Sequence, residues 1–457
     1  MNLVRQLPLG WVHASVADLC QFNPKTNSDP EISCGFVPMA ALGTRFREAL
    51  KFEIRPWGEV RSTYTHFQNG DVLVAKVTPC FENGKAGVVT NLPNGIGAGS
   101  SEFCVFRPSE LIEAKYLLAW FSSEAFRRHA TVSMTGSVGL KRVPKDVFIS
   151  EKISLPPKAE QKRIVEKLDL VLARVDSVNV RLARITPLLK RFRQSVLAAA
   201  TSGRLTEDWR KTHCSVQAIE TTLQAICVKD RVITYGVVKL GEETLGGVPC
   251  LRTSNVRWLR FEVDGIKLID PRISEDYGRT VLRGGEVLVN VRGTLGGVAV
   301  VSPAMIGWNV SREVAVVPID EKWAISEFIA FWIAGEACQR WLTGVAKGVA
   351  YTGINIEDLR ALPLKLPPKD EQAEIIRRVE TLFAFADRLE ARLQAAQTSA
   401  TRLTPSLLAK AFRGELVPQD PDDEPAAELL KRLAEARPAG KVAKKRQGET
   451  TTQVTAV

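Results

Sequence analysis

The sequence predicts an α+β protein made of two similar halves, each consisting of one domain with short strands followed by one long helix. Three observations support this fold class. A long amphipathic segment occurs twice, 211 residues apart. Shorter apolar motifs in front of each copy repeat at the same or nearly the same offset. The stretches around those motifs combine short β-rich runs with segments whose apolar residues have helical spacing.

The two long segments have matching ends and a matching apolar seam. The first runs from Leu155-Pro156-Pro157-Lys158 to Gly203, and the second runs from Leu366-Pro367-Pro368-Lys369 to Gly414. A proline near the first turn and a glycine beyond the last are typical of helix ends. Between these ends, apolar residues alternate in steps of four and three, which is the a/d pattern of a coiled coil. The seam comprises Ile164, Leu168, Val171, Val175, Val178, Leu182, Ile185, Leu189, Phe192 and Val196 in the first segment, and Ile375, Val379, Leu382, Ala386, Leu389, Leu393, Ala396, Ala400, Leu403 and Leu407 in the second.

We therefore expect two helices of roughly 45 residues, about 65 Å long, that pack on each other. Pro187 and Pro405 lie inside these segments at non-equivalent positions. Because proline lacks the N–H that an inner helix position donates, kinks there would break the symmetry locally.

The repeat extends into the domains that precede the helices. The matching motifs are Phe36-Val37-Pro38 with Gly247-Val248-Pro249, Leu117–Phe121 with Phe328–Trp332, and, with a slip of a few residues, Asn69–Val74 with Gly284–Val289. Between these motifs the halves diverge: residues 40–64 bear little likeness to residues 251–277. A repeated framework with diverged loops predicts two sites of the same kind with different preferences.

Inside each domain, Val72–Ala75 and Val287–Val289 are examples of short β-rich runs. The segments 113–128 and 326–342 have helical spacing of their apolar residues, which predicts helical structure there. The predicted organisation is a first domain over 1–154, a first long helix over 155–203, a second domain over 204–365, a second long helix over 366–414 and a flexible basic tail over 415–457.

Composition is that of a soluble folded protein, with 45% hydrophobic and 25% charged residues among 457. The net charge of +11 suggests a polyanionic partner, although seven basic side chains against two acidic ones between residues 431 and 457 supply +5 of it. We expect a cytoplasmic protein, since neither a secretory signal nor an apolar run long enough for a membrane span is found.

The sequence lacks the motifs that are typical of several kinds of catalytic, cofactor-binding and metal-binding site. Eight cysteines without a CxxC pair and only four histidines indicate neither a disulfide framework nor a metal site. A phosphate-binding loop, a glycine-rich S-adenosylmethionine turn and a nucleophile motif were sought and not found. The sequence therefore predicts a non-catalytic chain without a cofactor of its own.

The long segments resemble a known family. Leu155–Asp169, Leu189–Leu197 and Gly203–Arg210 closely resemble the central region of specificity subunits of type I restriction-modification enzymes, and Glu371–Glu380 and Leu407–Leu416 resemble the distal region, particularly of the IA type. With the duplicated architecture, the resemblance covers nearly the whole chain.

The resemblance implies two target-recognition domains that each read one half of a split, asymmetric double-stranded DNA sequence, related by a pseudo-two-fold repeat and separated by two antiparallel helices. It also implies that the helices, with their seam, dock two modification subunits, which use S-adenosylmethionine to methylate adenine. Restriction subunits would add translocation and cleavage with ATP and Mg²⁺. None of these activities would belong to this chain.

Candidate DNA contacts are loop residues whose side chains match base-edge donors and acceptors or phosphates. In the first domain they are Lys76, Thr78, Asn83, Lys85, Ser133, Thr135, Ser137, Lys141 and Arg142. In the second domain they are Arg252, Asn255, Arg257, Arg292, Thr294, Lys347, Tyr351 and Asn355. For each of them, a solvated loop residue is the alternative interpretation.

Two other functions remain open at this stage. A scaffold that does not bind DNA, with a coiled-coil arm between interaction domains, explains the seam but not the diverged basic loops. A self-sufficient methyltransferase is opposed by the missing cofactor motifs.

Overall fold

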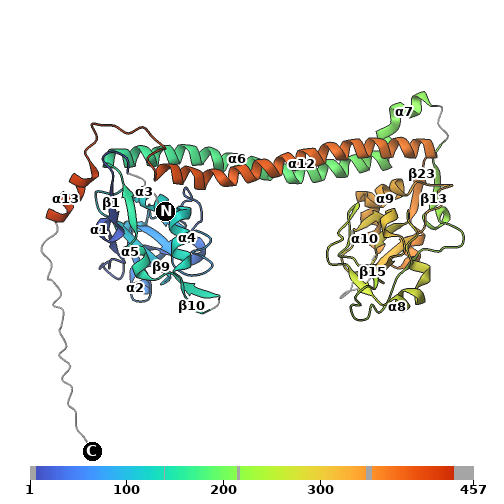
Figure 1. The fold of residues 1–457 in the computed structure, drawn as a ribbon, viewed down its shortest axis with the longest axis horizontal. Helices are drawn as coiled ribbons and strands as arrows, with labels where there is room; N and C mark the ends of the chain where they lie inside the picture. The colour runs from blue at the N-terminus through green and yellow to red at the C-terminus, as the bar shows by residue number, and fades with distance from the viewer. Residues whose placement is uncertain (1–6, 138, 214–216, 346–352, 437–457) are drawn as a thin grey trace, which may run out of the picture. The chain divides into compact units, whose positions relative to one another are not determined.

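The computed structural model describes residues 7–137, 139–213, 217–345 and 353–436. The chain divides into two units, of which unit 1 comprises residues 1–181 and 396–457 and unit 2 comprises residues 182–395. The two predicted long helices are present as α6, Lys158–Thr201, and α12, Lys369–Ala411 (Figure 1). Each unit holds one domain, one part of α6 and one part of α12, and the units are described separately.

Both long helices begin after a Pro-Pro pair and end at a glycine in the left-handed region, with φ of 77° at Gly203 and 71° at Gly414. Residues with a Cβ are disfavoured in that region, which explains why glycine ends both helices. Pro187 and Pro405 lie inside α6 and α12.

The first domain, in unit 1, contains two four-stranded sheets. One has the strand order β2-β9-β6-β7 and the other β4-β3-β8-β5. The strands of the first sheet are β2 (Cys20–Phe22), β9 (Phe103–Pro108), β6 (Val72–Ala75) and β7 (Ala86–Val88), and those of the second are β4 (Glu53–Pro56), β3 (Ser33–Val37), β8 (Ile96–Gly99) and β5 (Thr65–Gln68). A ribbon of β1 (Val12–Ser15) and β12 (Lys152–Leu155) and a hairpin of β10 (Thr135–Ser137) and β11 (Leu140–Arg142) complete the strands.

The helices of the first domain are short. They are α1 (Val16–Leu19), α2 (Trp57–Val60), α3 (Ala114–Ser122), α4 (Glu124–Val132) and α5 (Lys145–Ile149), and α13 (Ala426–Ala436) follows α12 in the same unit. The central strand β6 is buried on both faces: Val72 and Val74 pack with α3, whereas Leu73 and Ala75 pack with the second sheet. Successive strand residues point to opposite faces, so this apolar run belongs between two layers.

The second domain, in unit 2, repeats this arrangement. Its main sheet has the order β14-β22-β19-β20, with β14 (Thr234–Tyr235), β22 (Val314–Val317), β19 (Val287–Asn290) and β20 (Val298–Val300). Its second sheet is β18 (Lys267–Ile269), β15 (Val248–Leu251) and β21 (Asn309–Val310), beside the pairs β16 (Val256–Arg257) with β17 (Arg260–Phe261) and β13 (Ile219–Thr222) with β23 (Pro363–Leu366). The helices are α7 (Glu207–Thr212), α8 (Pro271–Asp276), α9 (Ser326–Ala334), α10 (Glu336–Val345) and α11 (Ile356–Arg360). The α+β class and the internal repeat are confirmed.

The segments with predicted helical spacing are helical in both domains, but each is interrupted once. The segments 113–128 and 326–342 each form two helices rather than one, with breaks at Ser123 and Gly335. The two break residues have the same extended backbone, with φ −67° and ψ 144°. At Ser123 the hydroxyl accepts a hydrogen bond from the N–H of Phe126 and caps the second helix. Such capping lets a chain turn at a point where the apolar spacing continues.

The long helices pack antiparallel within each unit. In unit 2, Leu189 of α6 packs with Ala386 and Leu393 of α12, whereas the later Val196 lies in one cluster with the earlier Ile375. In unit 1, Ile164 and Leu168 near the start of α6 share a cluster with Leu408 and Ala411 near the end of α12. The predicted coiled-coil pairing of the two segments is therefore present in both units.

The seam differs from the predicted one at several positions. Val178 and Leu403 are 44% and 46% exposed, although the heptad pattern places both in the seam. Leu172, Leu197 and Leu408 lie outside the predicted seam and are buried. The reason is that the helix ends also pack against a domain, as the clusters around Leu172 and Leu197 show, so the buried face is wider there than an a/d stripe.

A glutamine near the start of each long helix fastens that helix to its domain. Gln161 accepts a hydrogen bond from the N–H of Glu113 and donates to two backbone carbonyls, of Leu111 and Pro156. Gln372 makes the same three bonds, with the N–H of Ile325 and the carbonyls of Trp323 and Pro367. Both glutamines are fully buried. The repeated Glu-Gln pair in the sequence thus marks a repeated attachment point.

In the described part of the chain, we find no helix that is both long and apolar enough to cross a membrane.

Candidate nucleic-acid interface

Six first-domain candidates gather where β6 ends and the β10–β11 hairpin begins. They are Lys76, Thr78, Thr135, Ser137, Lys141 and Arg142. Thr78 fastens the hairpin: its N–H donates to the carbonyl of Lys141 (2.9 Å), and its hydroxyl accepts from the N–H of Lys141 (3.0 Å). The side chains of Thr135, Ser137 and Lys141 are exposed. The hairpin is therefore a polar, solvent-facing element with a fixed base.

Arg142 is held by an acidic partner that the sequence did not single out. Its Nε and Nη2 donate to both carboxylate oxygens of Glu102, at 2.7 to 3.1 Å. The Nζ of Lys76 lies 3.9 Å from the same carboxylate. Hydrogen bonding by Arg142 lowers the pKa of Glu102, so the carboxylate is ionised and its charge is balanced locally.

Three further first-domain candidates lie apart from this group or carry different contacts. Ser133 donates to the carbonyl of His129 at the end of α4. Asn83 is exposed in the turn between β6 and β7. Lys85, in the same turn, donates to the carbonyl of Met39 at 2.8 Å and is half-buried. The ammonium group of Lys85 thus makes a hydrogen bond within the first domain.

In the second domain, Arg292 and Thr294 lie in the glycine-rich turn after β19. The guanidinium of Arg292 is 5.4 Å from the centre of the Tyr235 ring, a cation–π arrangement. Gly293 and Gly296 have φ of 71° and 93°, which explains the glycines in this turn. Thr294 is exposed.

The segment after β15 supplies three more second-domain candidates. Arg252 donates to the carbonyl of Gly265 at 3.0 Å, and Arg257 is exposed on β16. Asn255 is only 2% exposed: its Oδ1 accepts from the N–H of Arg252 and its Nδ2 donates to the carbonyl of Glu262. The burial of Asn255 and its two hydrogen bonds inside the turn do not fit the predicted surface contact to DNA. We therefore assign Asn255 to the internal structure of its turn.

Asn290, at the end of β19, joins these two loops. Its Nδ2 lies within hydrogen-bond distance of the carbonyls of Val256 (3.1 Å), Thr294 (3.0 Å) and Thr253 (3.4 Å). The side chain is buried. The sequence does not point to Asn290, because the residue at the equivalent position of the first domain is Ala75, which has no amide group.

Of the three remaining second-domain candidates, Asn355 alone lies among the residues that the structure describes. Asn355 is exposed at the start of α11, close to the bridge between Arg292 and Gly353. Lys347 and Tyr351 lie outside the described residues.

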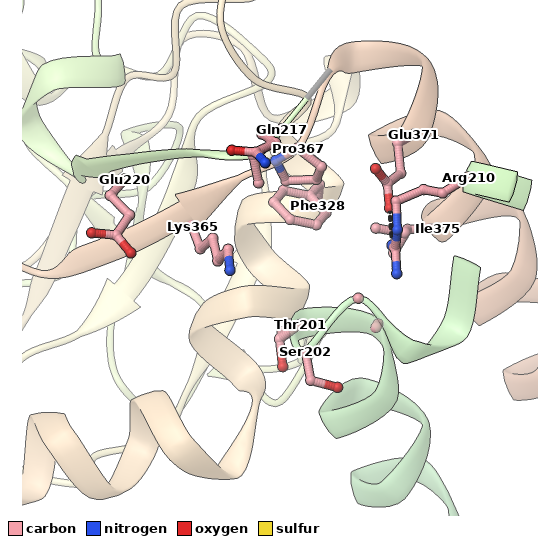
Figure 2. Close-up of a pocket in the computed structure, with 13 residues that line it drawn as sticks. Thr201, Ser202, Arg210, Gln217, Glu220, Phe328, Lys365, Pro367, Glu371 and Ile375 are labelled. Atoms are coloured by element: carbon pink, nitrogen blue, oxygen red, sulfur yellow. Dashed lines mark hydrogen bonds and ion pairs between the residues drawn. The ribbon is translucent and has the colours of Figure 1, made fainter. Parts of the chain in front are cut away.

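A cavity where α6 ends and α12 begins does not involve these candidates. It has a volume of about 670 Å³ and lies in unit 2. Figure 2 shows Glu220 and Lys365 on one side, from the β13–β23 ribbon, and Arg210 with Glu371 on the other. Glu371 also accepts from the hydroxyl of Thr206 at 2.7 Å. Both signs of charge line this cavity, so it lacks the uniform basic character of a phosphate site.

Comparison with known proteins assigns the chain to a protein family. The family model for the type I restriction modification DNA specificity domain matches residues 8–186 and 255–396. The chain therefore belongs to this family, and it is a specificity subunit of the type I restriction-modification class.

Individual relatives agree with the family match. The chain is 36% identical over 325 residues to the type I restriction enzyme EcoBI specificity subunit of Escherichia coli, covering 67% of this chain and 68% of the relative. The fold is similar to that of a chain from a structure on complex assembly and conformational transition of the type I R-M system, with a TM-score of 0.70, 21% identity and coverage of 90% and 99% of the two chains. It is also similar to the HsdS subunit from Thermoanaerobacter tengcongensis, with a TM-score of 0.60, 20% identity and coverage of 90% and 98%.

Proposed function

We propose that this chain selects the DNA sequence for a type I restriction-modification complex. The first domain reads one half of a split, asymmetric target, and the second domain reads the other half. The chain itself carries out no chemistry; adenine methylation belongs to two modification subunits that use S-adenosylmethionine. Translocation and cleavage belong to restriction subunits that use ATP and Mg²⁺.

One observation carries this proposal: two domains of the same strand order present different side chains at the same edge of the framework. In the first domain the polar hairpin with Arg142 lies beside the end of β6. In the second domain the turns with Arg252 and Arg292 lie beside the end of β19. Arginine, lysine and threonine are side chains that read base edges and phosphates. A shared frame with different readers suits a target made of two different halves.

Exposed apolar side chains on the long helices support the docking of partner subunits. They are Leu170, Val178, Val180 and Leu188 on α6 and Phe385 and Leu403 on α12. Contiguous exposed apolar patches are typical of surfaces that another protein covers. We infer that these side chains contribute to such patches along the helices.

A salt titration of DNA binding tests the proposal. The chain is purified with its modification subunits, and its affinity for a duplex carrying the target is measured at increasing salt. Because bound arginines and lysines release counterions from phosphates, the logarithm of the affinity should fall linearly with the logarithm of salt concentration, by several units of slope. Binding that is absent, or that does not change with salt, contradicts DNA recognition and favours a scaffold role.

A further inference from the structure

Both domains contain the same Ser-x-Glu turn at the start of a central strand. Ser100-Ser101-Glu102 precedes β9, and Ser311-Arg312-Glu313 precedes β22, 211 residues later. In each turn the serine hydroxyl accepts a hydrogen bond from the N–H of the glutamate, at 3.2 Å and 3.4 Å. The backbone carbonyl of each glutamate also bonds the segment that follows β6 or β19, through the N–H of Lys76 or Val291. The two glutamates therefore occupy equivalent places in the framework.

The side chains of the two glutamates hold different loops. The carboxylate of Glu102 accepts three hydrogen-bond contacts from the guanidinium of Arg142 in the hairpin. Glu313 accepts a hydrogen bond of 3.4 Å from the hydroxyl of Thr253, in the turn after β15. The glutamate is thus kept at the same place in both domains, whereas the loop that it binds differs. This is expected for a repeated framework whose DNA-contacting loops have diverged.

An acidic side chain at a surface that binds DNA needs a physical reason, because phosphates repel it. The ion pair with Arg142 provides this reason. Its bidentate hydrogen bonds fix the plane of the guanidinium, and the arginine balances the negative charge of Glu102. The arginine remains 44% exposed, and its Nη1 has no partner among the described residues. The Glu102–Arg142 pair thus leaves part of a fixed guanidinium exposed at the surface of the hairpin.

We propose that Glu102 and Glu313 are positioning residues for sequence recognition, each fixing the loop that reads one half of the target. Glu102 acts through Arg142 and the β10–β11 hairpin, and Glu313 acts through the Arg252–Asn255 turn. This inference rests on the proposed function, because it assumes that each domain reads one half-site. Neither glutamate contacts DNA in this account.

The test uses the complex with its modification subunits and duplexes altered in one half-site at a time, after the target has been determined from methylated DNA. Glu102→Gln should reduce discrimination in the half-site of the first domain about tenfold, the value of one well-placed base contact. Discrimination in the other half-site should not change. Glu102→Asp, which keeps the charge, should retain most of the discrimination.

A double-mutant comparison separates positioning from general damage. Because Glu102 acts through Arg142, the pair Glu102→Gln with Arg142→Gln should lose no more discrimination than Arg142→Gln alone. Glu53→Gln is the matched control, since it removes an exposed ion pair with Arg55 in the same domain and should leave both half-sites unaffected. The thermal midpoint of Glu102→Gln should match that of the control.

Three results would overturn this inference: full discrimination in Glu102→Gln, equal losses in both half-sites, or additive losses in the double variant. Failure of the proposed function looks different. In that case the unaltered complex would show no preference for any two-part sequence, whatever residue stands at position 102.

Discussion

At the scale of residues, the candidate interface depends on a few side chains that hold loops and on others that face outward. Asn290 joins two loops of the second domain by its amide, and Arg292 projects beside Tyr235 from one of them. Arg142 in the first domain is fixed by Glu102 in a comparable way. The outward-facing arginines are the ones that we propose as contacts to DNA.

Arg292→Ala should relax recognition in one half-site and leave the other intact. A lost base contact costs roughly 1 to 3 kcal/mol of discrimination. The measurement is the methylation rate on duplexes with single changes in either half-site. Arg340→Ala is the control, since Arg340 is an exposed arginine on α10 outside the candidate surface. An unchanged methylation pattern in Arg292→Ala would remove this residue from the interface.

Residue patterns identified candidate loops in both domains but not the roles of individual side chains in them. Lys76, Thr78, Lys141 and Arg142 were found because basic and hydroxyl side chains cluster in loops of the sequence. Asn255 has an equally suitable side chain, yet its amide is consumed inside a turn. Glu102 and Glu313 were missed because carboxylates are repelled by phosphates and are not expected at a surface that binds DNA. Their exact repetition at an offset of 211 residues was the available signal.

At the scale of elements, heptad spacing predicted both long helices and their pairing. The pattern holds best in unit 2, where Leu182, Leu189 and Leu393 lie in one cluster. It fails at Val178 and Leu403, which are exposed, and it could not foresee Leu172 or Leu408, which pack against a domain. The spacing of a helix alone does not reveal contacts made by a second surface. The breaks at Ser123 and Gly335 escaped for a similar reason, since apolar spacing continues across them.

Leu182→Lys should prevent assembly with the modification subunits. The substitution places a charge in the cluster around Leu189 and Leu393, where burial of an unpaired ammonium is unfavourable. Co-purification of tagged chain with the modification subunits measures the effect. Arg184→Ala, an exposed substitution less than one turn away, serves as the control. Full recovery of the partners with Leu182→Lys would contradict docking on the long helices.

At the scale of the whole molecule, the chain repeats one plan twice. Both domains have the same order of strands in the main sheet, and both attach to the first turn of a long helix through a buried glutamine. The sequence revealed this plan because the attachment points and the helix ends repeat at one offset. The loops between them diverged, and the half-sites that we propose for them depend on side-chain geometry that spacing does not encode.

Sequence recognition by two different domains can be measured by sequencing methylated adenines in cells that express this chain with its modification subunit. We expect one methylated motif in two unequal parts, separated by a fixed number of unspecified base pairs. The motif should disappear when this chain is omitted. A single uninterrupted motif, or methylation that persists without the chain, would contradict the account.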